Sequence, residues 1–167
     1  MYPGGNLVKL SPSDLTASAY TQGDIIFAKA ELAGAVPSRG GCSLLRTVTM
    51  FVEGAVAADD FMLLFFDNDT GLGEPAADPS SDITADEFRA ASCIGAMVFD
   101  GEKNATDIGN GLLYYSNSPS DEGANSIFVK AAGNNTSIWV AMFQPAGTLD
   151  LTDTDSITLT FGFQYLG

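Results

Sequence analysis

The sequence predicts an all-β protein, a jelly-roll-like two-sheet β-sandwich with one short helix. Short apolar runs recur along the chain, and loops rich in Gly, Pro, Asn, Asp and Ser separate them. One segment carries the sequence signature of a helix start. A chain of 167 residues fits one domain with a sizeable core. We therefore expect a single sandwich domain over residues 21–167, preceded by an N-terminal arm over residues 1–20.

The arm is rich in Gly, Ser, Pro and Thr, and its apolar knot consists of Leu7, Val8 and Leu10. This composition predicts a terminal segment with one short strand at most, which either frays or lies across the surface of a partner. The first strand of the domain is expected over residues 24–32.

We expect the fold to be organised around residues 44–66. In residues 44–52 apolar side chains alternate with Thr, so one face of this strand is expected to be buried and the other solvated. Residues 61–66, FMLLFF, do not alternate, so both faces of that strand must be covered. A helix, another sheet or another subunit can cover the second face of this strand. Our hypothesis about function assumes that another subunit covers it.

The remaining elements follow from turn and capping signals. Thr84 and Glu87 have the spacing of a capping box, which predicts a short helix over residues 85–92. A strand over residues 94–99 and a polar turn over residues 100–104 come next. Further strands are expected over residues 112–116, 126–131, 137–143 and 156–166, the last of which alternates most cleanly.

Charge and composition exclude several classes of function. Seven Lys and Arg against 21 Asp and Glu give a net charge of −14, which repels nucleic acids and acidic membranes. We therefore expect no nucleic-acid partner and no membrane partner. No apolar run approaches the length of a membrane span, and the N-terminus lacks the features of a signal peptide, so synthesis in the cytoplasm is expected.

The chain contains no histidine, which removes Ser-His-Asp and Cys-His mechanisms and His-ligated zinc. Cys42 and Cys93 are too few for a zinc site and are expected to be small buried residues, with a disulfide left open. We predict no catalytic residue, no metal site and no cofactor, and thus no enzyme. Two acidic loops, residues 67–74 and 150–155, are interpreted as solvated, although calcium binding by either stays open.

Aromatic residues in the predicted strands suggest contact surfaces. In SIWVAMF both faces are apolar, as in residues 61–66, and this favours core plus subunit interface over a sugar-stacking platform of Trp139, Tyr114 and Tyr115. The predicted interface with the capsid or with other copies consists of Leu7, Val8, Leu10, Phe61, Leu63, Phe65, Trp139 and Phe143.

Five segments occur in a familiar order: AYTQGDIIFAKAEL, VPSRGGCSLLRTVTMFVE, DDFMLLFFDND, SSDITADEFRAASCIGAMVF and ITLTFGFQYL. In this order the chain resembles the small structural proteins encoded beside the major capsid protein in tailed bacteriophages. The resemblance extends over most of residues 19–167 and is strongest at residues 60–67 and 83–99.

This resemblance implies a virion structural protein, a capsid decoration or cement protein that binds and stabilises the outer surface of a bacteriophage head. It further implies a jelly-roll fold, the major capsid protein as partner, a homotrimer, and a location on the capsid surface after synthesis in the host cytoplasm. A tail-associated or receptor- or glycan-binding β-sandwich module remains the alternative.

Overall fold

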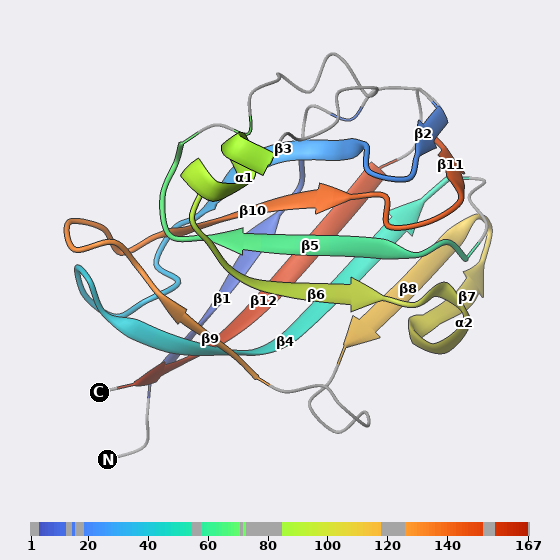
Figure 1. Cartoon of the computed structure of the whole chain (residues 1–167). Coiled ribbons are helices and arrows are strands. Elements are labelled where there is room, and N and C mark those ends of the chain that lie inside the picture. Colours follow the sequence, from blue (N-terminus) through green and yellow to red (C-terminus); the bar gives the residue numbers. More distant parts are fainter. Residues whose placement is uncertain are drawn as a thin grey trace.

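The predicted two-sheet β-sandwich is confirmed by the computed structural model, which describes residues 4–12, 15, 19–54, 58–70, 72, 85–117, 126–151 and 156–166 (Figure 1). The strands of the first half are β1 (Gly5–Leu10), β2 (Ala19–Thr21), β3 (Ile25–Leu32), β4 (Cys42–Glu53) and β5 (Phe61–Phe66). The second half contains α1 (Ala85–Ala90), β6 (Cys93–Phe99), α2 (Gly101–Asn104), β7 (Ala105–Gly109), β8 (Leu112–Asn117), β9 (Ile127–Lys130), β10 (Ile138–Phe143), β11 (Thr148–Asp150) and β12 (Ser156–Leu166).

The strand pairing is that of a jelly roll. β1 pairs with β12, β3 with β10, β4 with β9 and β5 with β6, all antiparallel. These four pairs are nested, because each lies inside the previous one along the chain. The chain thus behaves as one long hairpin wrapped into two sheets, and α2, β7 and β8 are inserted between β6 and β9.

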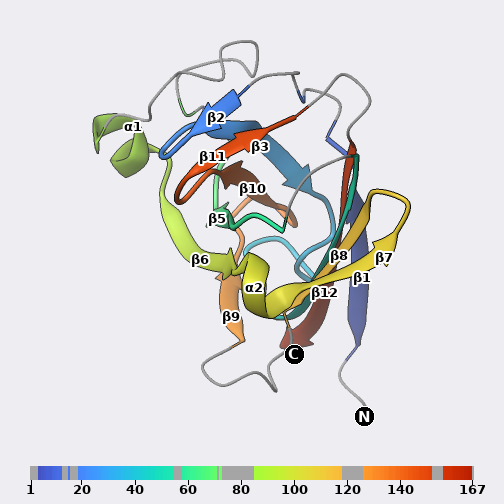
Figure 2. The ribbon, with the colours of Figure 1, turned by 90° about the vertical axis from the view of Figure 1, so that its right-hand side faces the viewer.

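The two sheets face each other across the core (Figures 1 and 2). The larger sheet has the order β1-β12-β4-β8-β7, with β9 also paired to β4, and the smaller sheet has the order β3-β10-β5-β6. A two-stranded ribbon of β11 and β2 lies at one end. Because every strand pair is antiparallel and most strands alternate, each sheet turns one row of side chains toward the other.

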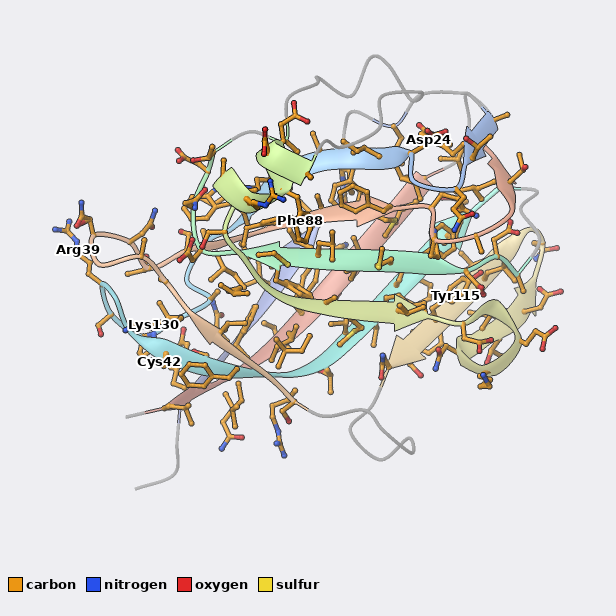
Figure 3. The ribbon with its side chains drawn as sticks, viewed as in Figure 1. Asp24, Arg39, Cys42, Phe88, Tyr115 and Lys130 are labelled. Carbon is orange, nitrogen blue, oxygen red and sulfur yellow. The ribbon has the colours of Figure 1, made fainter. Side chains whose placement is uncertain are left out.

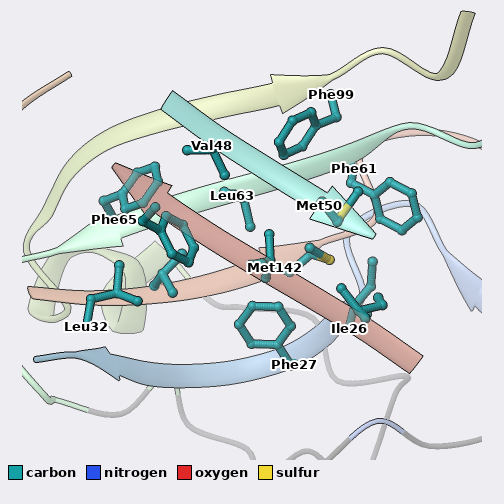
Figure 4. Packing of buried hydrophobic residues seen from close by; sticks show 14 of the residues in the cluster. Ile26, Phe27, Leu32, Val48, Met50, Phe61, Leu63, Phe65, Phe99 and Met142 are labelled. Carbon is teal, nitrogen blue, oxygen red and sulfur yellow. The ribbon is translucent and has the colours of Figure 1, made fainter. Parts of the chain in front are cut away.

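The core between the sheets is rich in large apolar side chains (Figure 4). Ile157, Leu159 and Phe161 of β12 point inward in alternation, as the sequence predicted. The ring of Phe161 meets that of Phe65 edge-on, with centroids 6.1 Å apart. Phe65 is fully buried, and burying such a side chain typically contributes roughly 1.5–3 kcal/mol.

Part of the predicted N-terminal arm belongs to the larger sheet. β1 pairs with β12 from Gly5 opposite Gln164 to Leu10 opposite Leu159. At most one short strand was expected in this segment, and the structure has β1, which forms one border of the sheet, together with the start of β2. The division of the chain at residue 20 stays a prediction.

The second cover of β5 comes from the chain itself. On the face turned away from the core, Leu64 and Phe66 pack with Leu72 and with Ala91, which follows α1. Phe66 is fully buried and Leu64 is 7% exposed. The prediction that this face is covered by another subunit is wrong, because α1 and the segment after β5 fold back over the smaller sheet.

Four short elements differ from the expectation: α2, β7 and the two ribbon strands β2 and β11, none of which was predicted. Residues 100–104, expected to be a polar turn, contain α2, because the carboxylate of Asp100 accepts hydrogen bonds from the backbone N–H groups of Glu102 and Lys103. β7 follows directly and was not predicted.

No helix in the described part of the chain is long and apolar enough to cross a membrane.

Candidate interaction surface

The acidic segment after β5 is held by the ammonium group of Lys29. Its Nζ donates hydrogen bonds to the main-chain oxygens of Asn68 (3.2 Å), Thr70 (2.6 Å) and Ala91 (3.3 Å). The same group lies 4.2 Å from the centroid of the Phe66 ring, a cation–π contact. One lysine therefore ties the segment after β5 and the end of α1 to β3.

Burial lowers the pKa of Lys29 to about 8, and the charges of Asp67 and Asp69 partly oppose this shift. In the acidic loop of residues 67–74, for which calcium binding was left open, main-chain oxygens that could bind Ca²⁺ thus accept hydrogen bonds from a protein cation. Among the described residues, no group of three or more His, Cys, Asp or Glu side chains could hold a metal ion. Glu74, Asp153 and Asp155 lie outside the described residues.

Most of the predicted interface residues lie inside the protein. Phe61, Leu63 and Phe65 have no exposed surface and point into the core between the sheets (Figure 4). Phe143 is 3% exposed and belongs, with the half-buried Trp139, to the cluster beneath the segment that covers β5. None of the four fully packed phenylalanine and leucine side chains can contact a partner in this fold.

The three predicted residues of the arm are divided between the two faces of β1. Val8 and Leu10 are half-buried and pack against the core. Leu7 points the other way and is 73% exposed. Of the predicted interface, Leu7 is therefore the side chain that the fold leaves most open to a partner.

Leu7 lies on the outer face of the larger sheet, where the pairing register places hydroxyl side chains in a row. Thr160 of β12 is opposite Thr49 of β4, which is opposite Ser116 of β8. Such residues favour strands and keep the middle of the face polar without adding charge.

Apolar side chains flank this row on both sides. Phe51 lies opposite Tyr114, and their ring centroids are 4.9 Å apart at an interplanar angle of 48°. On the other side Leu44 lies opposite Phe128. Phe51 is 39% exposed and Phe128 is 53% exposed, so the face presents two separate apolar patches to solvent.

The charges of this face contrast with those of the whole chain. By register and exposure its charged side chains include Lys9, Arg46 and Lys130, and its one acidic residue in the described part is Glu53. The chain as a whole carries a net charge of −14. The outer face of the larger sheet is therefore locally basic in an acidic protein.

A shallow depression lies where β1, β12 and β4 meet, and Gly5, Asn6, Leu7, Arg46, Gly162 and Phe163 line it. Glycine is required at its floor, because a Cβ atom on Gly162 would lie 2.4 Å from Oγ1 of Thr47. Arg46 reaches this face through a bulge in the pairing of β4 with β12, and its guanidinium donates a hydrogen bond to the Ser126 hydroxyl at 2.8 Å.

Sequence reasoning missed this surface. The alternation of Thr49, Phe51 and Glu53 was visible and predicts one outward face, but it does not show which strands lie beside β4. The bulge at Arg46 leaves no recognisable pattern in the sequence.

Cys42 and Cys93 are free, half-buried thiols on different sheets.

Comparisons with known proteins give structural likenesses alone. No family model matches the chain, and no curated protein matches it. A chain of tomato aspermy virus is similar over 98% of this chain and 79% of that chain, at 7% identity and a TM-score of 0.35. A chain of the Israeli acute paralysis virus particle is similar over 96% and 71%, at 9% identity and a TM-score of 0.31. A chain of the Kashmir bee virus virion is similar over 95% and 68%, at 9% identity and a TM-score of 0.29.

Proposed function

We propose that the protein is a virion structural protein that decorates the outer surface of a bacteriophage head and stabilises it by binding the major capsid protein. The observation that carries this proposal is the outer face of the larger sheet, which exposes Leu7, Phe51 and Phe128. The sequence resemblance to phage structural proteins supports the same role. A protein with this role requires a stable body and a contact surface rather than reactive groups.

We place the capsid contact at β1, because its side chain Leu7 is the most exposed large apolar residue of the described chain. β1 also borders the larger sheet, where its outer backbone edge is open to a neighbouring segment. Deleting the arm would remove β1 and expose β12, so its effect on binding would be confounded with misfolding. A substitution at Leu7 avoids this problem.

Co-sedimentation of the purified protein with purified phage heads tests the proposal. We expect the wild-type protein to sediment with heads and Leu7→Asp to lose most of this binding, because a charge replaces the apolar contact. Val98→Asp is the matched control: Val98 is 48% exposed on β6, which belongs to the smaller sheet, and its replacement should leave binding unchanged.

Electron microscopy of virions carrying the labelled protein gives the second measurement. Label on the head surface is the expected result. Label confined to the tail, or absent from the particle, would refute the decoration role. Equal binding of the Leu7 and Val98 variants would refute only the place of the contact.

A tail-associated or glycan-binding module is the second candidate function, and the pair of Phe51 and Tyr114 favours it, since exposed rings can stack on sugars. Tyr115, considered for the same role, is buried, and its hydroxyl donates a hydrogen bond to the main-chain oxygen of Asp59 at 3.1 Å. Binding to a glycan array without binding to heads would favour this function over capsid decoration.

A further inference from the structure

The basic side chains of the protein fall into two groups. Three have partners nearby: Lys29 binds main-chain oxygens, Arg89 pairs with Asp86, and Lys103 pairs with Asp100. The other four of the seven have no carboxylate partner among the described residues, and they are Lys9, Arg39, Arg46 and Lys130. An acidic chain thus keeps more than half of its cations free of ion pairs in its described part.

Most of these unpaired cations gather at one end of the molecule, which we name the basic end and define as Arg39, Arg46, Phe128 and Lys130. Lys130 lies opposite Cys42 at the start of β4, and Arg39 lies in the preceding loop (Figure 3). A hydrogen bond of 2.9 Å from the Gly40 N–H to the Asn135 oxygen holds that loop against the segment after β9. Phe128 adds an exposed aromatic ring. One exposed carboxylate, that of Glu31 on β3, also lies near this end, where it accepts a hydrogen bond from the Ser137 hydroxyl at 2.6 Å.

The opposite end carries unbalanced carboxylates, and we name it the acidic end, defined as Asp60, Glu102, Asp107 and Ile108. Asp60 is fixed there by the hydrogen bond that its Oδ1 accepts from the Gly101 N–H at 2.8 Å. Glu102 and Asp107 are exposed, and neither forms an ion pair among the described residues. The one cation nearby is Lys103, which pairs with Asp100 and also interacts with Glu102 and Asp60, so the carboxylates at this end outnumber the described cations. Ile108 is 56% exposed.

β4 separates the two ends. Its first residue pairs with Lys130, and its last, Glu53, pairs with Leu112, which pairs in turn with Gly109 of β7. A strand of 12 residues is about 35–40 Å long at roughly 3.3 Å per residue. The basic and acidic ends therefore point in opposite directions and cannot neutralise each other within one molecule, given a screening length of about 8 Å at physiological salt.

We propose that the basic end of one copy docks on the acidic end of a second copy, in a head-to-tail contact. Two copies with a charge of −14 each repel one another in most orientations, and this one juxtaposes opposite charges. Each end also offers one exposed large apolar side chain, Phe128 or Ile108, so the contact has an apolar centre with a charged rim. A head-to-tail contact builds a ring when its rotation closes and a filament when it does not.

The proposal is independent of the proposed function, because the isolated protein tests it. Light scattering coupled to size exclusion at about 0.15 M salt should give a mass of more than one chain, because a screening length of about 8 Å weakens the repulsion between the net charges more than the attraction between groups in contact. Raising the salt to about 1 M should dissociate the assembly. Arg39→Glu with Lys130→Glu, or Glu102→Lys with Asp107→Lys, should each weaken association by roughly tenfold or more. The variant that combines all four substitutions restores opposite charges across the contact and should associate again.

Arg89→Glu is the matched control, since it reverses an exposed arginine on α1 that belongs to neither defined end, and it should not change the mass. Circular dichroism checks that each variant folds. If a variant carrying Asp107→Lys does not fold, Glu102→Lys alone replaces the double variant. A wild-type protein of single-chain mass at about 0.15 M salt would overturn the proposal. Association that survives both double charge reversals would also overturn it. The same holds if reversing the charges of the basic end abolishes binding to heads but leaves the mass unchanged, because the basic end would then bind the capsid rather than a second copy.

Discussion

At the scale of single residues, Lys29 supports the layer that covers β5. Its pKa is about 8 in the folded protein against 10.5 when unperturbed, so the unfolded chain binds more protons between these values. Stability attributable to this group therefore rises as the pH increases from about 8 to about 10.5 and is level below pH 8. Urea unfolding of wild type and Lys29→Met should show this rise in the wild type and a flatter profile in the variant.

Lys9→Met is the control for this titration, because Lys9 is an exposed lysine on β1 with no ion pair among the described residues. It should keep the wild-type profile. If the free energies of unfolding of wild type and Lys29→Met change in parallel over this pH range, burial does not lower the pKa of Lys29.

At the scale of elements, β5 is packed on both faces by its own chain. Phe65 faces the core between the sheets and Phe66 faces the cluster with Leu72 and Ala91. We expect Phe65→Ala and Phe66→Ala each to lower the free energy of unfolding by about 3–5 kcal/mol, since each leaves a cavity. Urea titrations measure both.

The two substitutions also test the origin of the cover. The loss at Phe66 should be the same at dilute and concentrated protein, because the covering residues belong to the same chain. If the loss of unfolding free energy at Phe66 appears only at high protein concentration, another subunit covers this face of β5.

Strands with clean alternation were predictable from the sequence. Residues 156–166 were expected as the last strand, and β12 has these bounds. The short helix was expected over residues 85–92 and ends at Ala90 in the structure, while Thr84 of its predicted cap lies outside the described residues. β7 was missed because it has one large apolar residue, Ile108, and follows directly on α2.

The candidate surface was harder to predict, and particular residues explain why. FMLLFF shows that both faces of β5 are covered, but not by what, because the covering Leu72 and Ala91 are small apolar signals in a loop and at a helix end. Leu7 was identified because it stands out in a polar segment. Arg46 and Lys130 were not, since their proximity depends on the pairing of β4 with β9 and on a bulge.

At the scale of the whole molecule, the net charge of −14 opposes compactness. Added salt screens this repulsion, so the single chain should become more stable as the proposed head-to-tail contact becomes weaker. For the Arg39→Glu, Lys130→Glu variant, calorimetry should show a higher unfolding temperature at about 0.5 M salt than at low salt, by roughly 2–4 °C for each kcal/mol gained. An unfolding temperature that falls with salt would contradict this reasoning.

The position of β12 between β1 and β4 has a consequence for how the protein is made. While a ribosome is still synthesising residues 1–155, the larger sheet lacks β12, the strand that joins β1 to β4, and β1 lacks the strand with which it pairs. The nested hairpin can therefore be completed only after nearly the whole chain has left the ribosome. The first strand, β1, must then pair with the last strand, β12. Until that moment the unpaired edges of β1 and β4 are open to other nascent chains, which makes slow, chaperone-sensitive maturation the expected behaviour of this topology.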